Sequence, residues 1–332
     1  MIAVRVTESS LVAAARREAC RAGAALGFPE PELGRVAIIA TELATNLVRH
    51  GSGGELLVAD HDDALGKRLD LTALDQGSGM ADLSACLRDG FSTAGSPGTG
   101  LGAVMRQATA FDVFTRVGGG TAILARVQPR VASGAGTAAR VAVAGVCLAK
   151  AGETECGDAW AFMPQGSACT VMLADGLGHG PLAAAASGLA AATFTRAANR
   201  DPADITRTLH DALRVTRGAA VSVVRLDFAG GTATFCGIGN VAGSLLNGTT
   251  IRRMVTLNGT AGAAARRIQA FGYPLERGTV AILYSDGLVS SWTLDPYPGL
   301  LSHDPALIAG VLYRDHVRGR DDVTVVVAKE TP

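Results

Sequence analysis

The sequence has few lysines, few aromatic residues and no excess of either charge. Lys67, Lys150 and Lys329 are the only lysines among 332 residues, and 30 basic side chains balance 30 acidic ones. A neutral chain without a basic cluster argues against a nucleic-acid footprint or a basic membrane patch. No Gly-x-x-x-x-Gly-Lys-Ser/Thr segment occurs, which excludes a P-loop, so any nucleotide site needs another fold. We expect small molecules or proteins as partners.

Paired cysteines and long apolar runs are also missing. The six cysteines are scattered without a Cys-x-x-Cys pair, which argues against a zinc site and favours reduced thiols. No basic run followed by an apolar segment marks a signal peptide, so we expect a cytoplasmic protein. Residues 176–195 carry no charged side chain, but Gly, Pro and His lie at the front and alanine dominates the rest. This composition predicts a buried helix and no membrane span.

The length of the chain favours two domains, because a single core usually stops growing near about 250 residues. Residues 129–140 are small and have few apolar anchors, which is typical of a linker. We therefore predict domains over 1–128 and 141–332. Hydrophobic periodicity predicts, in the first, helices over 10–26, 31–50 and 101–109 and strands over 55–60, 68–74, 112–116 and 121–127. Ser9 or Ser10 is the expected cap of the first helix.

The second half combines strands with flanking helices. Strands are predicted over 141–149, 169–174, 221–228, 232–238, 243–246, 280–284 and 323–328, and helices over 181–196, 202–217 and 305–317. Turn sequences such as Asn247-Gly248 separate neighbouring strands. We expect an α+β arrangement in this half and a layered helix-and-sheet sandwich in the first.

Three elements of the first half suggest a nucleotide site. Glu42 and Asn46 are four residues apart, so they project from one helix face, where an amide oxygen suits Mg²⁺ and a carboxylate can orient a hydroxyl. Asp75 ends a strand before Gly77 and Gly79, where glycine permits close backbone approach. The segment Gly98-Thr99-Gly100-Leu101-Gly102 opens a helix whose free N–H groups can bind phosphate. Taken alone, each element is more typical of an ordinary helix face or turn than of a nucleotide site.

The order and spacing of these elements match the N box and glycine boxes of GHKL-type ATPases. The stretch from Asp75 to Leu124, DQGSGM…RDGFSTAGSPGTGLGAV…FDVFTRVGGGTAIL, closely resembles the small serine kinases of bacterial sigma-factor partner switching. The resemblance covers about residues 1–128 and implies a Bergerat-type α/β sandwich. It implies ATP between sheet and helix, Asn46 on Mg²⁺, Glu42 as the activating carboxylate and Asp75 on adenine. The implied nucleotide-binding positions in the glycine boxes are Gly77, Gly79, Gly98, Thr99, Gly100, Leu101 and Gly102.

Aspartates follow or begin apolar strands at four places in the second half. Rigid carboxylates at strand ends are what a two-metal hydrolytic centre needs. Asp175 could bridge two ions while the Gly176 carbonyl completes the ligand set, and Asp286 and Asp321 would hold the second ion. Asp158 is a further candidate near the first ion. A single Asp-Gly is ordinarily a turn, but four such sites in order are hard to attribute to turns.

The segments GDAWAF, DGLGHG, GIGN, SDGL and DDVTVVV are similar to those of the metal-dependent PPM-type serine/threonine phosphatases of the SpoIIE family, over about residues 141–329. The resemblance implies an α-β-β-α sandwich, Mg²⁺ or Mn²⁺, and a water activated by these ions that attacks phosphoserine or phosphothreonine. Asp321 fits the family pattern better than Asp322, although both remain open as ligands. His179 is a candidate acid, with a loop hydrogen bond as an equal alternative. Trp160 and Phe162 are expected in the core, and Gly239-Asn240 as a turn beside the site.

Together these resemblances imply a bifunctional switch in which an ATP-dependent kinase is fused to an opposing phosphatase. Its expected partners are STAS-domain antagonists or stressosome proteins in a sigma-factor pathway. One alternative is a binding module whose first half holds ATP and captures an antagonist or sigma factor. Another keeps the phosphatase active and leaves the kinase half degenerate.

Overall fold

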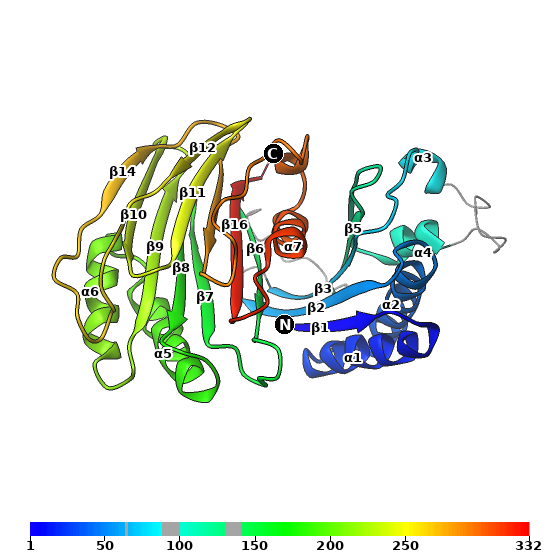
Figure 1. Ribbon diagram of the computed structural model, residues 1–332, viewed down its shortest axis with the longest axis horizontal. Helices are drawn as coiled ribbons and strands as arrows, with labels where there is room; N and C mark the ends of the chain where they lie inside the picture. Colours follow the sequence, from blue (N-terminus) through cyan, green and yellow to red (C-terminus); the bar gives the residue numbers. More distant parts are fainter. Residues whose placement is uncertain (64–65, 88–99, 130–140, 332) are drawn as a thin grey trace. The chain divides into compact units, whose positions relative to one another are not determined.

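A computed structural model describes residues 1–63, 66–87, 100–129 and 141–331 (Figure 1). The chain divides into two compact units, Met1–Gly136 and Thr137–Pro332, here called the first and second unit. Apart from Pro129, the predicted linker 129–140 lies outside the described residues. Each unit is described by itself.

The first unit is one antiparallel sheet with its helices packed on one face. The strands are ordered β1-β2-β3-β5-β4, and each neighbouring pair is antiparallel. The strands are β1 (Ile2–Val6), β2 (Gly54–Asp63), β3 (Gly66–Asp75), β4 (Ala110–Thr115) and β5 (Thr121–Val127). The helices are η1 (Ser9–Leu11), α1 (Val12–Ala25), α2 (Glu30–His50), α3 (Leu83–Cys86) and α4 (Gly100–Gln107).

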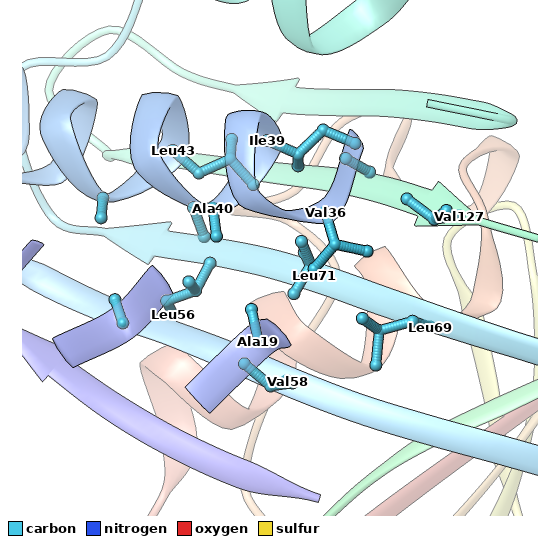
Figure 2. Packing of buried hydrophobic residues seen from close by; sticks show 14 of the residues in the cluster. Ala19, Val36, Ile39, Ala40, Leu43, Leu56, Val58, Leu69, Leu71 and Val127 are labelled. Carbon is cyan, nitrogen blue, oxygen red and sulfur yellow. The ribbon is translucent and has the colours of Figure 1, made fainter. Parts of the chain in front are cut away.

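Packing of α2 on the sheet fixes which side chains remain available for a site. Its apolar residues recur every three or four positions, as in Val36, Ala40 and Leu43, and they are fully buried. Figure 2 shows this stripe lying over alternate residues of β2 and β3, among them Leu56 and Leu71. Besides the sheet, α2 packs against α1 and α4.

The predicted start of the first helix was wrong. A 3-10 turn over Ser9–Leu11 precedes α1, and neither N-cap is a serine with a capping hydrogen bond. The Ser10 hydroxyl donates instead to the Glu8 carboxylate. The helix prediction itself, 10–26, is otherwise close to α1, and β1 is a strand that the sequence pattern did not predict.

The second unit contains two facing sheets. One sheet is ordered β13-β10-β9-β8-β7, with β14 paired to β10, and the other β12-β11-β15-β16-β6. The first comprises β7 (Asp158–Gln165), β8 (Ala168–Gly176), β9 (Ala219–Asp227), β10 (Thr232–Ile238), β13 (Thr256–Leu257) and β14 (Phe271–Pro274). The second comprises β6 (Val141–Leu148), β11 (Ala242–Asn247), β12 (Thr250–Arg253), β15 (Val280–Tyr284) and β16 (Val323–Glu330). The helices are α5 (Pro181–Ala197), α6 (Pro202–Leu213), η2 (Leu300–Ser302) and α7 (Pro305–His316).

Side-chain alternation on β8 separates two cores. Val171 and Leu173 belong to the core between the sheets, whereas Met172 and Ala174 belong to the core that α5 and α6 cover. The third helix, α7, contacts β6 and β16 of the other sheet. The second unit is thus an α-β-β-α sandwich, which confirms the predicted fold class. Trp160 and Phe162 stack at 6.1 Å between ring centroids and are partly buried against the inter-sheet core.

The alanine-rich segment after Gly176 forms α5, which buries Ala186, Ala190 and Phe194 against the sheet. The prediction of a buried helix is confirmed. Among the helices in the described part of the chain, none has the length and apolarity needed to cross a membrane.

Candidate functional sites

On the face of α2 that packs against α4, Glu42 and Asn46 lie half-buried beside Gly100, the first residue of α4. A Cβ placed on Gly100 would lie 3.3 Å from Glu42 Oε2 and 3.7 Å from Asn46 Oδ1. The Asn46 amide nitrogen is buried and has no hydrogen-bond partner among the residues that the structure describes. A buried unpaired amide beside a glycine is an arrangement that an additional polar group can complete. Leu101 and Gly102 follow in α4, whereas Gly98 and Thr99 lie outside the described residues.

Asp75, the last residue of β3, lies close to the C-terminal end of α2. Its Oδ1 accepts hydrogen bonds from the Gly77 N–H at 2.8 Å and the Thr121 N–H at 3.1 Å, which fix the carboxylate. A Cβ on Gly51, which follows α2, would lie 2.6 Å from the Asp75 Cβ. Since a helix rises about 1.5 Å per residue, Asn46 is roughly 7 Å along the helix from this point.

Glycine is required in the loop after Asp75. Gly79 has φ +70°, and a Cβ there would lie 2.0 Å from the Arg116 carbonyl oxygen. A Cβ on Gly77 would lie 2.5 Å from the His50 carbonyl oxygen. The glycine-box loop is therefore packed directly on the end of α2, and the structure gathers Glu42, Asn46, Asp75, Gly77 and Gly100 along one helix.

In the second unit, Asp158 and Asp175 are direct partners on neighbouring strands. Asp158 begins β7, Asp175 lies near the end of β8, and the two pair across the antiparallel ladder. Partners of this kind point to the same face with Cβ atoms about 5 Å apart. Because Asp175 alternates in phase with Leu173, this face is the one between the sheets.

The other sheet contributes Asp286 and Asp321 from the facing strand ends. Asp286 follows β15 and accepts a hydrogen bond from the Asn240 side chain. Asp321 precedes β16. Together with Arg318 and Arg320, these two aspartates line a cavity of about 350 Å³.

Electrostatic coupling connects the two sets of carboxylates. Burial raises the pKa of Asp175 to about 8, and the charges of Asp158, Asp286, Asp321 and Asp322 contribute to the increase. Burial likewise raises the pKa of Asp158 to about 7, the nearby Ser285 and Thr324 side chains oppose this increase, and the charges of Asp322 and Asp286 add to it. The pKa of Asp286 is also raised, first by burial and then by Asp321. Carboxylates from four strand ends therefore act on one another.

The donor set fits a hard divalent cation. Within the described part of the chain, Asp158 Oδ2 is buried without a hydrogen-bond partner, and all the candidate ligands are oxygens, as Mg²⁺ and Mn²⁺ prefer. Gly176 lies beside them, and a Cβ there would lie 2.2 Å from the Ala183 carbonyl oxygen. In the described residues no group of three or more His, Cys, Asp or Glu side chains is already arranged so that it could hold a metal ion.

Asp321 and Asp322 have different environments. Asp322 is only 4% exposed, and its Oδ1 accepts from the Lys150 N–H at 2.9 Å. Asp321 lines the cavity with Asp286. This difference favours Asp321 as the metal ligand, because Asp322 already accepts a hydrogen bond from the backbone. The assignment of Asp321 over Asp322 stays a prediction.

Several contacts around the site were not predicted. Asn240 was expected only as a turn, yet its side chain donates to Asp286; the GIGN segment was the available signal. The Ser285 hydroxyl accepts from the Thr324 N–H at 2.9 Å and ties the ends of β15 and β16 together. His179 forms a hydrogen bond with Glu153 at 2.7 Å, as the loop alternative anticipated.

The raised pKa values predict how the metal-free chain responds to pH. The folded-state pKa values of Asp158 and Asp175 lie above 3.8, so their contribution to stability is present at low pH and is lost as pH rises through about 7 and about 8. We expect the unfolding temperature of the second unit to fall between about pH 5 and about pH 8 without metal, and Mn²⁺ to restore it most at the upper end. Calorimetry at a series of pH values measures this. In Asp158→Asn the fall should be smaller; an equal fall in that variant would contradict the assignment.

Comparisons with known proteins agree with the two sites. The family model for Stage II sporulation protein E (SpoIIE) matches residues 165–330, and that for the histidine kinase-like ATPase domain matches residues 6–127. The serine/threonine-protein kinase RsbT of Bacillus subtilis is 33% identical over 122 residues, which are 37% of this chain and 92% of RsbT. The phosphoserine phosphatase RsbX of the same organism is 27% identical over 143 residues, covering 42% of this chain and 71% of RsbX.

Two solved structures resemble more than half of the chain. One, from work on the bacterial stressosome, has a TM-score of 0.52 and 26% identity and covers 57% of this chain and 99% of its own. The other, RsbX in complex with magnesium, has a TM-score of 0.50 and 23% identity and covers 57% of this chain and 96% of its own. At that identity the second likeness supports the fold alone.

Proposed function

The chain belongs to the SpoIIE family of PPM-type phosphatases, with a histidine kinase-like ATPase domain as its first unit, and from this we propose that it both adds and removes a phosphoryl group in one partner-switching pathway. The observation that carries the proposal is the coexistence of two separate constellations, one in each unit. An amide, a carboxylate and glycine loops lie along α2, and coupled aspartates lie between the sheets of the second unit.

The proposed phosphatase reaction is hydrolysis of phosphoserine or phosphothreonine. Asp158, Asp175, Asp286, Asp321 and the Gly176 carbonyl would hold Mg²⁺ or Mn²⁺. These ions supply an activated water and neutralise charge on the phosphoryl group when bound. The side chains themselves fix the separation of the ions, because each is attached to the end of a packed strand, and Asn240 orients Asp286.

The proposed kinase reaction transfers the terminal phosphoryl group of ATP to a serine or threonine. Asn46 would contribute its amide oxygen to Mg²⁺, and Glu42 would orient the acceptor hydroxyl. Asp75 would accept from the adenine amino group. The glycine loops would allow the backbone to approach the nucleotide closely. Such contacts hold the nucleotide in place, and phosphoryl transfer is catalysed mainly by positioning.

We propose a STAS-type antagonist as the shared substrate, in a stressosome or sigma-factor pathway. The support is that the two relatives, RsbT and RsbX, are a serine/threonine-protein kinase and a phosphoserine phosphatase. Both activities running together would consume ATP without net effect. A partner or ligand that favours one activity at a time is therefore part of the proposal.

The test uses the full chain with labelled ATP and a candidate STAS protein, followed by the phosphorylated protein with Mn²⁺. Transfer and removal at the same residue, with their ratio changed by a partner, are expected. Equal and unregulated rates would count against a switch. Capture of the STAS protein without transfer, together with active dephosphorylation, would support the alternative in which the first unit holds ATP as a binding module.

A further inference from the structure

The connection between α7 and β16 holds two arginines beside the candidate phosphatase site. The Arg318 N–H donates to the Gly287 carbonyl oxygen at 2.9 Å, and the Val289 N–H donates to the His316 carbonyl oxygen at 2.9 Å. These bonds attach the connection to the segment that follows Asp286. Gly319 has φ +69°, so the chain turns sharply between Arg318 and Arg320. Both arginines line the cavity together with Asp286 and Asp321.

Within the described residues, neither arginine side chain makes a polar contact that stabilises the fold. Arg318 and Arg320 are exposed, and within the described residues neither guanidinium has an ion pair or a side-chain hydrogen bond. By contrast, the buried Arg314 on α7 pairs with Asp315 at 2.7 Å. Two unpaired guanidinium groups at the rim of a cavity have all their donors available for a ligand.

The charges of the side chains around this cavity indicate what kind of ligand it binds. Two divalent cations would balance the four aspartate ligands of the site, which leaves the two negative charges of a phosphoryl group to be matched by other cationic groups. Guanidinium groups present paired N–H donors that match two oxygens of a phosphate. Resting on the proposed function, we infer that Arg318 and Arg320 bind the non-bridging oxygens of the substrate phosphoryl group and select phosphorylated over unmodified protein.

Inorganic phosphate is the probe, because it is the product of the proposed reaction and carries the same oxygens. Calorimetric titration of phosphate into the Mg²⁺-loaded full chain is compared between wild type, Arg318→Ala and Arg320→Ala. Each variant is expected to weaken phosphate binding at least about tenfold, the usual effect of losing a hydrogen bond to a charged group. Arg318→Lys should be intermediate, because lysine keeps the charge without the paired donors. Arg277→Ala is the control, since β15 separates it from Asp286 by roughly 15 Å.

Mg²⁺ affinity separates phosphate recognition from a merely structural role. Removing a cation beside Asp286 should leave Mg²⁺ affinity unchanged or increase it, while phosphate affinity falls. Parallel loss of both affinities, or phosphate binding within about twofold of wild type, would overturn the inference. The proposed function fails separately: a wild-type chain that binds phosphate through these arginines but hydrolyses no phosphoprotein refutes the phosphatase reaction and keeps the anion site.

Discussion

In Asp175→Asn, phosphatase turnover is expected to fall at least about a hundredfold, while ATP-dependent transfer by the first unit stays unchanged. After burial, the charges of Asp158, Asp286, Asp321 and Asp322 all raise the pKa of Asp175, which pairs directly with Asp158 across neighbouring strands. Asparagine keeps the shape of the side chain but removes the negative charge that a divalent cation requires. The loss should follow Mn²⁺ binding, measured by calorimetry on the same variant.

In Asp175→Asn, the unfolding temperature of the metal-free second unit should rise while the affinity for Mn²⁺ falls. Without metal, Asp175→Asn removes one of several repelling buried carboxylates, so the metal-free second unit should unfold at a higher temperature than wild type. Asp211→Asn is a matched control, because that side chain is 71% exposed on α6 and pairs with Arg214. Turnover in Asp175→Asn within a few-fold of the Asp211→Asn value at saturating Mn²⁺ would end the two-metal assignment.

The same measurement decides between the adjacent aspartates. Asparagine at position 322 can still accept from the Lys150 N–H through its amide oxygen, so Asp322→Asn should keep most of the Mn²⁺ affinity. Asp321→Asn should lose it, because Asp321 faces the cavity with Asp286. The reverse result would make Asp322 the ligand.

The aspartates could be predicted from the sequence because each lies at the end of an apolar strand. Asp286 follows the fully buried Val280–Tyr284 segment, and the hydrophobic run fixes where the strand stops and the carboxylate begins. The contact of Asn240 with Asp286 could not be predicted from its place after β10 in the GIGN segment, and Arg318 follows a helix and no apolar strand. Each reaches Asp286 or the segment after it from a turn distant along the chain, and only the pairing of β11, β15 and β16 makes them neighbours.

Strands β1 and β7 were missed for a related reason. Both are edge strands, and after Asp158 every residue of β7 is only half-buried, so no alternation of apolar and polar residues marks β7 although Ala159 to Met163 are all apolar. Pro164, near the end of β7, is tolerated at an edge but argues against a strand in a sequence pattern. A hydrophobic pattern in the sequence indicates which residues are buried. It does not indicate strand pairing, such as that of β7 with β8.

Asn46→Ala is expected to reduce transfer from ATP by about a hundredfold or more, the usual scale for removing a group that positions charge in the transition state. The buried Asn46 Nδ2 has no hydrogen-bond partner among the described residues, so a phosphate oxygen beside Gly100 could accept from it and leave Oδ1 for Mg²⁺. Transfer of labelled phosphate to a STAS protein measures the effect. Phosphatase activity of the same variant provides an internal control, since the second unit contains none of these residues.

Thr45→Ala is the matched control on α2. The Thr45 hydroxyl donates to the Thr41 carbonyl oxygen at 2.7 Å, so its loss removes only a local bond within the helix and transfer should be preserved. Wild-type transfer in Asn46→Ala would exclude Asn46 from the metal site. If wild type itself binds ATP and the STAS protein without transfer, Asn46→Ala should still weaken ATP binding, and the first unit is then a nucleotide-dependent binding module attached to a phosphatase.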